Sequence, residues 1–163
     1  MMEKVRIGII GCGGIANGKH MPSLKKLPNV EMVAFCDIIE QRAIDAKAKY
    51  GTPDAAVYTD YKELLADTTI DVVHVCTPNR SHSFITVDAL ESGKHVMCEK
   101  PMAINSAEAK KMLDAAARTG KKLTIGYQTR QSLGAQYLKT EALNGTFGES
   151  SVTLSFFPPY TVQ

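Results

Sequence analysis

The segment Lys4-Val-Arg-Ile-Gly-Ile-Ile10 is followed directly by Gly11-Cys-Gly-Gly-Ile-Ala16. The first part is short and apolar, which predicts a buried strand over 5–10. The second part is a G-x-G-x-x-A turn, and a helical pattern follows it from about residue 14 to residue 27. A strand that enters such a turn and leaves it as a helix is typical of a dinucleotide-binding site, because the first N–H groups of the helix face the phosphates.

Each position of the turn has a physical reason for its residue. Gly11 permits the tight turn, and Gly13 lets the backbone come close to a pyrophosphate because it has no side chain. Gly14 and Ile15 begin the helix and offer their N–H groups to the phosphates, while Ala16 lets the helix pack closely on the strand. We therefore expect Gly11, Gly13, Gly14 and Ile15 to bind the cofactor.

A second apolar run, 31–36, ends at Asp37, about 20 residues after the turn. A carboxylate there accepts hydrogen bonds from the hydroxyls of the adenosine ribose and repels a 2′-phosphate, so it favours NAD over NADP. Arg42, about one turn into the next predicted helix, could reach a 2′-phosphate, although a solvated helix residue is the simpler interpretation. The alternative to the whole pattern is a glycine-rich connection without a ligand. The strand before the turn, the helix after it and the acid at the end of strand two argue against that alternative.

Composition narrows the class of protein. The chain has 163 residues, with 44% hydrophobic and 22% charged residues, which predicts one globular domain, or one domain and part of another. A net charge of +2 gives no support to nucleic-acid or membrane binding. No apolar run is long enough to span a bilayer, and the N-terminus lacks a signal-peptide pattern, so we expect a cytoplasmic protein.

The four cysteines, Cys12, Cys36, Cys76 and Cys98, show neither C-x-x-C pairing nor zinc-ligand spacing. Each lies at or near the end of an apolar run, so the thiols are expected near one edge of a sheet. A redox or metal role is one interpretation. The interpretation that we favour is small apolar side chains in a reducing compartment, and no metal site is predicted.

Apolar runs alternate with helical patterns along the chain. This alternation predicts parallel strands joined by right-handed crossovers, that is, an α/β fold with a Rossmann-type doubly wound parallel sheet. Asp60 is predicted to cap the third helix and Ser106 the fifth. The predicted strands are 5–10, 31–36, 57–58, 71–76, 95–98 and 122–127, and the predicted helices are 14–27, 40–50, 61–66, 81–91 and 107–118.

Ligands of such sheets bind outside the carboxyl ends of the strands, so the residues that follow each strand are candidates for chemistry. Thr77, Pro78 and Asn79 follow the fourth strand in a turn that would lie along the cofactor. The fifth strand is followed by Glu99 and Lys100, with Pro101 stiffening the exit.

The four histidines are interpreted from their positions in the predicted elements. His74 and His95 lie inside predicted strands and are expected to be structural. His20 and His82 lie closer to the crevice, but a satisfied helix histidine is the expected state of each from the residues alone.

Four segments together resemble one family. They are Gly8-Ile-Ile-Gly-Cys-Gly-Gly-Ile-Ala16, Cys76-Thr-Pro-Asn-Arg-Ser-His82, Gly93-Lys-His-Val-Met-Cys-Glu-Lys-Pro101 and Gly126-Tyr-Gln-Thr-Arg130. The chain resembles the N-terminal half of the Gfo/Idh/MocA oxidoreductases, which are named for glucose-fructose oxidoreductase, inositol dehydrogenase and a rhizopine-catabolism protein. The Glu-Lys-Pro segment is the most specific element, since the first motif fits many dehydrogenases.

The resemblance implies an NAD(P)-dependent oxidoreductase that acts on a sugar, cyclitol or related polyol hydroxyl. Lys100 matches the family's lysine near the nicotinamide and the substrate hydroxyl, where it would hydrogen-bond the reacting oxygen and help to move its proton. Asn79 and His82 match positions that line the cofactor loop, and Glu99 and Lys100 are also predicted to contact the cofactor. Gln128 matches the start of the crossover to a second domain and is predicted to contact the cofactor.

The resemblance also implies a second α/β domain that supplies most of the substrate pocket and through which relatives assemble as homo-oligomers. We predict a dinucleotide-binding domain over 1–128, and over 129–163 a linking helix and the first strand, 148–157, of a truncated substrate domain. The expectation is that the chain is part of a longer protein, and that it binds dinucleotide but turns over slowly or not at all.

Two other functions fit parts of the pattern. A non-catalytic dinucleotide sensor has the same fold, although it needs no lysine for proton transfer. An unrelated NAD enzyme, such as a semialdehyde or aspartate dehydrogenase, shares the first motif but is not expected to have Glu-Lys-Pro in this setting. Nucleic-acid binding has little support because 19 Lys and Arg residues nearly balance 17 Asp and Glu residues.

Overall fold

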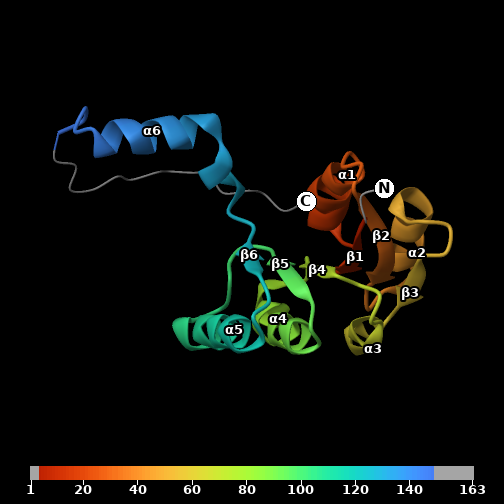
Figure 1. The fold of residues 1–163 in the computed structure, drawn as a ribbon. Coiled ribbons are helices and arrows are strands. Elements are labelled where there is room, and N and C mark those ends of the chain that lie inside the picture. Colours follow the sequence, from red (N-terminus) through yellow and green to blue (C-terminus); the bar gives the residue numbers. More distant parts are fainter. Residues whose placement is uncertain (1–3, 149–163) are drawn as a thin grey trace. The chain divides into compact units, whose positions relative to one another are not determined.

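A computed structural model of the protein describes residues 4–148 (Figure 1). The chain divides into two compact units, one that ends at Gly126 and one that begins at Tyr127, and each is described by itself. The strands of the first unit are β1 (Val5–Ile10), β2 (Val30–Cys36), β3 (Ala56–Tyr58), β4 (Val72–Val75), β5 (His95–Cys98) and β6 (Leu123–Ile125). Its helices are η1 (Ala16–His20), α1 (Met21–Leu24), α2 (Glu40–Tyr50), α3 (Tyr61–Ala66), η2 (Asn79–Ser81), α4 (His82–Glu91) and α5 (Ser106–Thr119).

The six strands form one sheet in the order β3-β2-β1-β4-β5-β6, and every pair of neighbours is parallel. This is the strand order of the dinucleotide-binding doubly wound fold, which reverses direction between β1 and β4. The predicted fold class is therefore confirmed. The carboxyl ends of β1, β2, β4 and β5 meet at one edge, which brings the segments after Ile10, Cys36, Val75 and Cys98 together.

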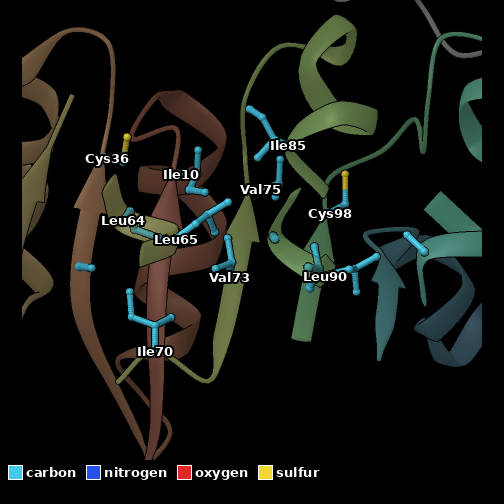
Figure 2. Close-up of a cluster of buried hydrophobic side chains, with 14 of the residues drawn as sticks. Ile10, Cys36, Leu64, Leu65, Ile70, Val73, Val75, Ile85, Leu90 and Cys98 are labelled. Atoms are coloured by element: carbon cyan, nitrogen blue, oxygen red, sulfur yellow. The ribbon is translucent and has the colours of Figure 1, made fainter. Parts of the chain in front are cut away.

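Apolar side chains leave the sheet on both faces, as a sheet with helices on both sides requires. On one face α3, α4 and α5 cover a cluster that includes Ile10, Val73 and Val75, with Leu64 and Leu90 from the helices (Figure 2). On the other face α1 and α2 cover a second cluster around Phe35. Figure 1 shows the two groups of helices on opposite sides of the sheet. Each fully buried large side chain contributes about 1.5–3 kcal/mol to stability.

The predicted boundaries agree closely with the observed elements. Asp60 caps α3 as predicted, since its side chain accepts a hydrogen bond from the Lys62 N–H at 2.9 Å. The prediction that Ser106 caps the fifth helix is wrong. Asn105 holds the extended backbone of an N-cap, and its side-chain oxygen accepts the Glu108 N–H at 2.9 Å, while Ser106 is the first helical residue.

The segment after the glycine turn is helical from residue 14 to residue 24, and the turns between Ala16 and His20 are wider than those of an α-helix. Such a π-helical stretch within a helix is frequent at functional sites. Among the described residues, no helix is both long and apolar enough to cross a membrane.

The second unit contains a 3-10 turn, η3 (Gln128–Gln131), and a helix, α6 (Leu133–Leu143), whose N-cap is Ser132. The predicted linking helix therefore exists but begins later than residue 129, and Gly145 follows it with φ +77°. Apart from residue 148, the predicted strand over 148–157 lies outside the described residues. The assignment of residues 129–163 to a substrate domain stays a prediction.

We expect Gly11→Ala to lower the free energy of unfolding by at least about 2 kcal/mol. Gly11 has φ +91°, and a Cβ atom there would lie 2.7 Å from the carbonyl carbon and oxygen of Cys76. Gly93→Ala is the matched control because Gly93 has φ +84° with nothing within 4 Å of its Cβ position. It isolates the cost of the backbone conformation, about 1 kcal/mol. Urea denaturation of both variants measures the difference, and equal losses would contradict the close approach.

Candidate functional site

The Asn17 side chain holds two carbonyl groups of the glycine turn from behind. The Asn17 side-chain nitrogen donates to the carbonyl oxygens of Cys12 at 2.7 Å and Gly13 at 3.2 Å. The helix then begins at Gly14, so its first N–H groups have no partner within the helix. No atom lies within 4 Å of a Cβ built at Gly13 or Gly14. The turn therefore has both the donors and the open space that an anion requires.

Asp37 connects the turn to the end of β2. Its Oδ2 accepts the Cys12 N–H at 2.9 Å, and its Oδ1 accepts the Ile39 N–H at 2.9 Å. The residue is only 7% exposed, so the carboxylate stands in a fixed orientation at the sheet edge. A carboxylate oxygen can accept more than one hydrogen bond, so each oxygen of Asp37 has acceptor capacity left for a ligand hydroxyl.

A cleft of about 610 Å³ opens beside this carboxylate, between the ends of β1, β2 and β4. Its volume suits a ligand of the size of a nucleoside or larger. Apolar and cationic side chains share its wall: Ile38 and Phe84 are exposed apolar residues, and Arg42 and Arg80 carry charge. Nη1 of Arg42 lies 4.0 Å from Oδ1 of Asp37.

Five of the predicted cofactor residues line this cleft: Gly11, Gly13, Asp37, Thr77 and Pro78. Gly14 and Ile15 are exposed at the start of the adjoining helix, and Asn79 is exposed in η2. Gln128 lies in the second unit, and its contact with a cofactor stays a prediction. The binding roles of all these residues likewise remain predictions.

Lys100 is exposed at the end of β5, while Glu99 beside it is only 4% exposed. Glu99 Oε1 pairs with His20 Nε2 at 2.8 Å, and its Oε2 accepts the Lys100 backbone N–H at 3.0 Å. A Cβ atom at Gly126 would lie 3.2 Å from Glu99 Oε1, so the end of β6 packs directly on the carboxylate. Glu99 is therefore a buried support of the loop that presents Lys100.

His82 is fully buried, which places its ring away from the open cleft. Its Nδ1 lies 2.7 Å from the Pro101 carbonyl oxygen and its Nε2 lies 2.8 Å from the Thr77 carbonyl oxygen. The ring thus lies between the loop after β4 and the loop that holds Lys100, and in its neutral form it donates to one of the two carbonyl oxygens. Its predicted contact with a cofactor is not tested, and the observed contacts assign it a supporting place.

Sequence reasoning missed two groups of residues. Arg80, Ile38 and Phe84 line the cleft. Arg80 and Ile38 directly follow the predicted site residues Asn79 and Asp37, and this position could have identified them. His74, expected to be structural, contacts His20: their Nδ1 atoms are 3.1 Å apart and their rings meet edge to face. Among residues 4–148, no group of three or more His, Cys, Asp or Glu residues is arranged to hold a metal.

The four cysteines are free thiols and all are buried. Burial, followed by the nearby Asp37 charge, raises the pKa of Cys12 and of Cys36 to about 12. Burial raises the pKa of Cys98 to about 11 and also raises that of Cys76. These thiols are protonated at neutral pH and behave as small apolar side chains. This agrees with the interpretation that we favoured from the sequence.

Comparison with known proteins places this geometry in a family. A family model described as "Oxidoreductase family, NAD-binding Rossmann fold" (GFO_IDH_MocA) matches residues 5–127. The chain belongs to this family. The resemblance seen in the sequence is thereby confirmed, and the match covers the whole sheet together with the segment that contains Glu99 and Lys100.

Several Gfo/Idh/MocA relatives carry an activity in their names. D-glucoside 3-dehydrogenase of Escherichia coli (strain K12) is 40% identical over 149 residues, which are 91% of this chain and 42% of the relative. Inositol 2-dehydrogenase of Salmonella typhimurium is 34% identical over 146 residues, 89% of this chain and 43% of the relative. The chain thus spans about two fifths of the length of the curated relatives it matches.

Solved structures agree with the family assignment. The WlbA dehydrogenase of Bordetella pertussis, solved with NADH and UDP-GlcNAcA, has a TM-score of 0.82 and 28% identity, over 90% of this chain and 41% of that chain. KijD10, a 3-ketoreductase of Actinomadura kijaniata solved with NADP, has a TM-score of 0.81 and 26% identity, over 90% of this chain and 46% of that chain.

We expect none of the four thiols to react quickly with Ellman's reagent at pH 8 while the chain is folded. A thiol with a pKa near 12 is ionised to only about one part in ten thousand at that pH, and burial also blocks the reagent. All four thiols should react in denaturant, which serves as the control. Rapid labelling of even one thiol in the folded chain would contradict the buried positions.

Proposed function

We propose that this chain is the dinucleotide-binding part of a dehydrogenase of the Gfo/Idh/MocA family. The observation that carries the proposal is the Asp37 carboxylate, held by two backbone N–H groups at the mouth of the cleft and next to the glycine turn. In this assignment Asp37 would hold the adenosine ribose at the cleft. The N–H groups of Gly13 and Gly14 would hold the pyrophosphate, and Lys100 would face the nicotinamide.

We propose NAD as the cofactor in preference to NADP. A 2′-phosphate on the ribose would lie close to the buried Asp37 carboxylate, and the two negative charges would repel each other. Arg42 opposes this preference only weakly, because its guanidinium is already 4.0 Å from the same carboxylate and is about half exposed. Solved relatives contain either NADH or NADP, so the preference rests on this chain's own residues.

For the reaction we propose oxidation of a sugar, cyclitol or related polyol hydroxyl, as in the named relatives. A bound nicotinamide would supply the hydride acceptor for the carbon that is oxidised. Lys100, exposed at the end of β5, hydrogen-bonds the reacting oxygen and helps to move its proton. The named activities of the relatives above favour this enzyme over a non-catalytic sensor.

Two further assignments extend the proposal to the whole protein. The four free thiols favour a reducing compartment, and we propose the cytoplasm. Assembly of the whole protein into a homo-oligomer also stays a prediction, and it rests on the family resemblance.

We expect calorimetric titration of the chain to show binding of NAD that is at least about tenfold tighter than that of NADP. Gly13→Ala should weaken NAD binding by at least about tenfold without loss of stability, because its Cβ meets no protein atom and enters the space assigned to the pyrophosphate. Gly18→Ala is the matched control, since its Cβ position is equally open but lies on the exposed side of the helix.

Three results would count against this assignment. Failure of the wild-type chain to bind either dinucleotide would reject the cofactor site itself. Preference for NADP would overturn the role of Asp37 and point to Arg42. Equal effects of the Gly13 and Gly18 substitutions would show that the turn does not hold the pyrophosphate.

We expect the 163-residue chain alone to reduce NAD slowly or not at all with methyl glucosides or inositols. The curated relatives extend over more than twice the matched length, so we propose that residues outside the matched region complete their substrate sites. Appearance of NADH absorbance is the measurement, with the mass of the intact chain verified. Robust turnover by a sample of that mass would contradict the expectation.

A further inference from the structure

The residues on each side of Lys100 are both held by a buried histidine. Before it, Glu99 Oε1 pairs with His20 Nε2 at 2.8 Å. After it, the Pro101 carbonyl oxygen lies 2.7 Å from His82 Nδ1. Both histidines are at most 7% exposed, while Lys100 itself is exposed. The backbone of the lysine is therefore fixed from two sides while its side chain is left to reach outward.

The two histidines come from different parts of the predicted cofactor site. His20 ends the wide-turn segment Ala16–His20, which follows the glycine turn directly. His82 begins α4 and also contacts the Thr77 carbonyl oxygen, at the wall of the cleft. The loop that holds Lys100 is thus joined to the glycine-turn helix through His20 and to the cleft loop through His82.

The contacts of His20 with Glu99 and His74 define how its ring is oriented. A carboxylate only accepts hydrogen bonds, so His20 Nε2 is the donor to Glu99. His20 Nδ1 lies 3.1 Å from His74 Nδ1, and the tautomers of the two rings decide which of these two atoms donates. Burial, followed by the nearby His20, lowers the pKa of His74 to about 4, which keeps His74 neutral at ordinary pH. His74 thereby fixes the ring of His20 with its Nε2 hydrogen toward Glu99.

Glu99 has little room to move once these partners are in place. It is 4% exposed, and a buried carboxylate is stable only while its oxygens are paired. Its Oε2 accepts the Lys100 backbone N–H, and the backbone of Gly126 passes so close that a Cβ there would lie 3.2 Å from Oε1. A displacement of His20 would therefore be transmitted to the Lys100 backbone through a rigid side chain.

We propose that His20 is a positioning residue that acts through Glu99 to hold Lys100 at a fixed position relative to the glycine turn. The inference rests on the proposed function, because this position matters only if a dinucleotide bound at the turn is to meet the lysine. One hydrogen-bonded connection then keeps the cofactor-binding helix and the reacting side chain at a constant separation, and proximity of this kind is a large part of catalysis.

Two substitutions of His20 separate the hydrogen bond from the volume of the ring. In His20→Gln the side-chain amide nitrogen reaches as far as Nε2 and still donates to Glu99, whereas in His20→Asn the amide is too short. His95→Asn is the control for loss of a histidine elsewhere. His95 is at the start of β5, and its Nδ1 accepts the Lys122 N–H at 2.9 Å, a hydrogen bond that asparagine can replace.

The readouts are two signals of the Lys100 amide in NMR spectra of the labelled chain: its hydrogen-exchange rate and its shift on addition of NAD. In His20→Asn we expect exchange at least about tenfold faster than in wild type and loss of the NAD-dependent shift. NAD affinity should change by less than about threefold because the glycine turn is intact. His20→Gln and His95→Asn should both resemble wild type.

A Lys100 amide that exchanges and shifts in His20→Asn as it does in wild type would overturn the proposal. The proposal would also fail if the Lys100 amide exchanged as fast in His20→Gln as in His20→Asn. If His20→Asn does not melt cooperatively, Glu99→Gln replaces it. The two donors meet different carboxylate oxygens, and in glutamine one of these becomes an NH2 group that cannot accept. Unchanged exchange there would also overturn the proposal. Absence of NAD binding by wild type would reject the proposed function instead, while the exchange rates in the unliganded chain would still test the role of His20.

Discussion

The close approach of Gly11 to the carbonyl group of Cys76 is the constraint on which the rest of the structure depends. The chain leaves β1 between β2 and β4 and must turn at once, and only a residue without a Cβ atom, at φ +91°, fits there. This turn sets where the following helix begins, and so where the first N–H groups of that helix point. It also sets the position of His20, the last residue of the wide-turn segment.

From this turn the site extends in two directions along the same sheet edge. Toward β2 lie Asp37 and the cleft, whose volume and mixture of apolar and charged side chains suit an adenosine. Toward β5 lies Lys100, held through Glu99 and Pro101 by two buried histidines. The order of strands in a doubly wound sheet places both at carboxyl ends, so one fold supplies cofactor binding and a reactive side chain without a long loop.

Local chemistry explains which features the sequence could predict. The strands, the glycine turn and the Asp60 cap depend on periodicity and on contacts between near neighbours in the chain, and Asp37 was predicted from its distance after the turn. Asn105 replaced Ser106 as a cap because either residue can accept the hydrogen bond, and the backbone conformation decides between them. The contacts among His20, His74 and Glu99 join residues 54 and 79 positions apart, and the direction of a buried side chain over such a separation has no signature in one sequence.

A crystal structure of the chain with NADH would test the cofactor site directly. We expect the adenosine ribose hydroxyls on the Asp37 carboxylate, the pyrophosphate against the N–H groups of Gly13 and Gly14, and the nicotinamide facing Lys100, with the His20–Glu99 pair intact. A dinucleotide bound outside the cleft would contradict this assignment. So would one bound in the cleft with its nicotinamide directed away from the end of β5.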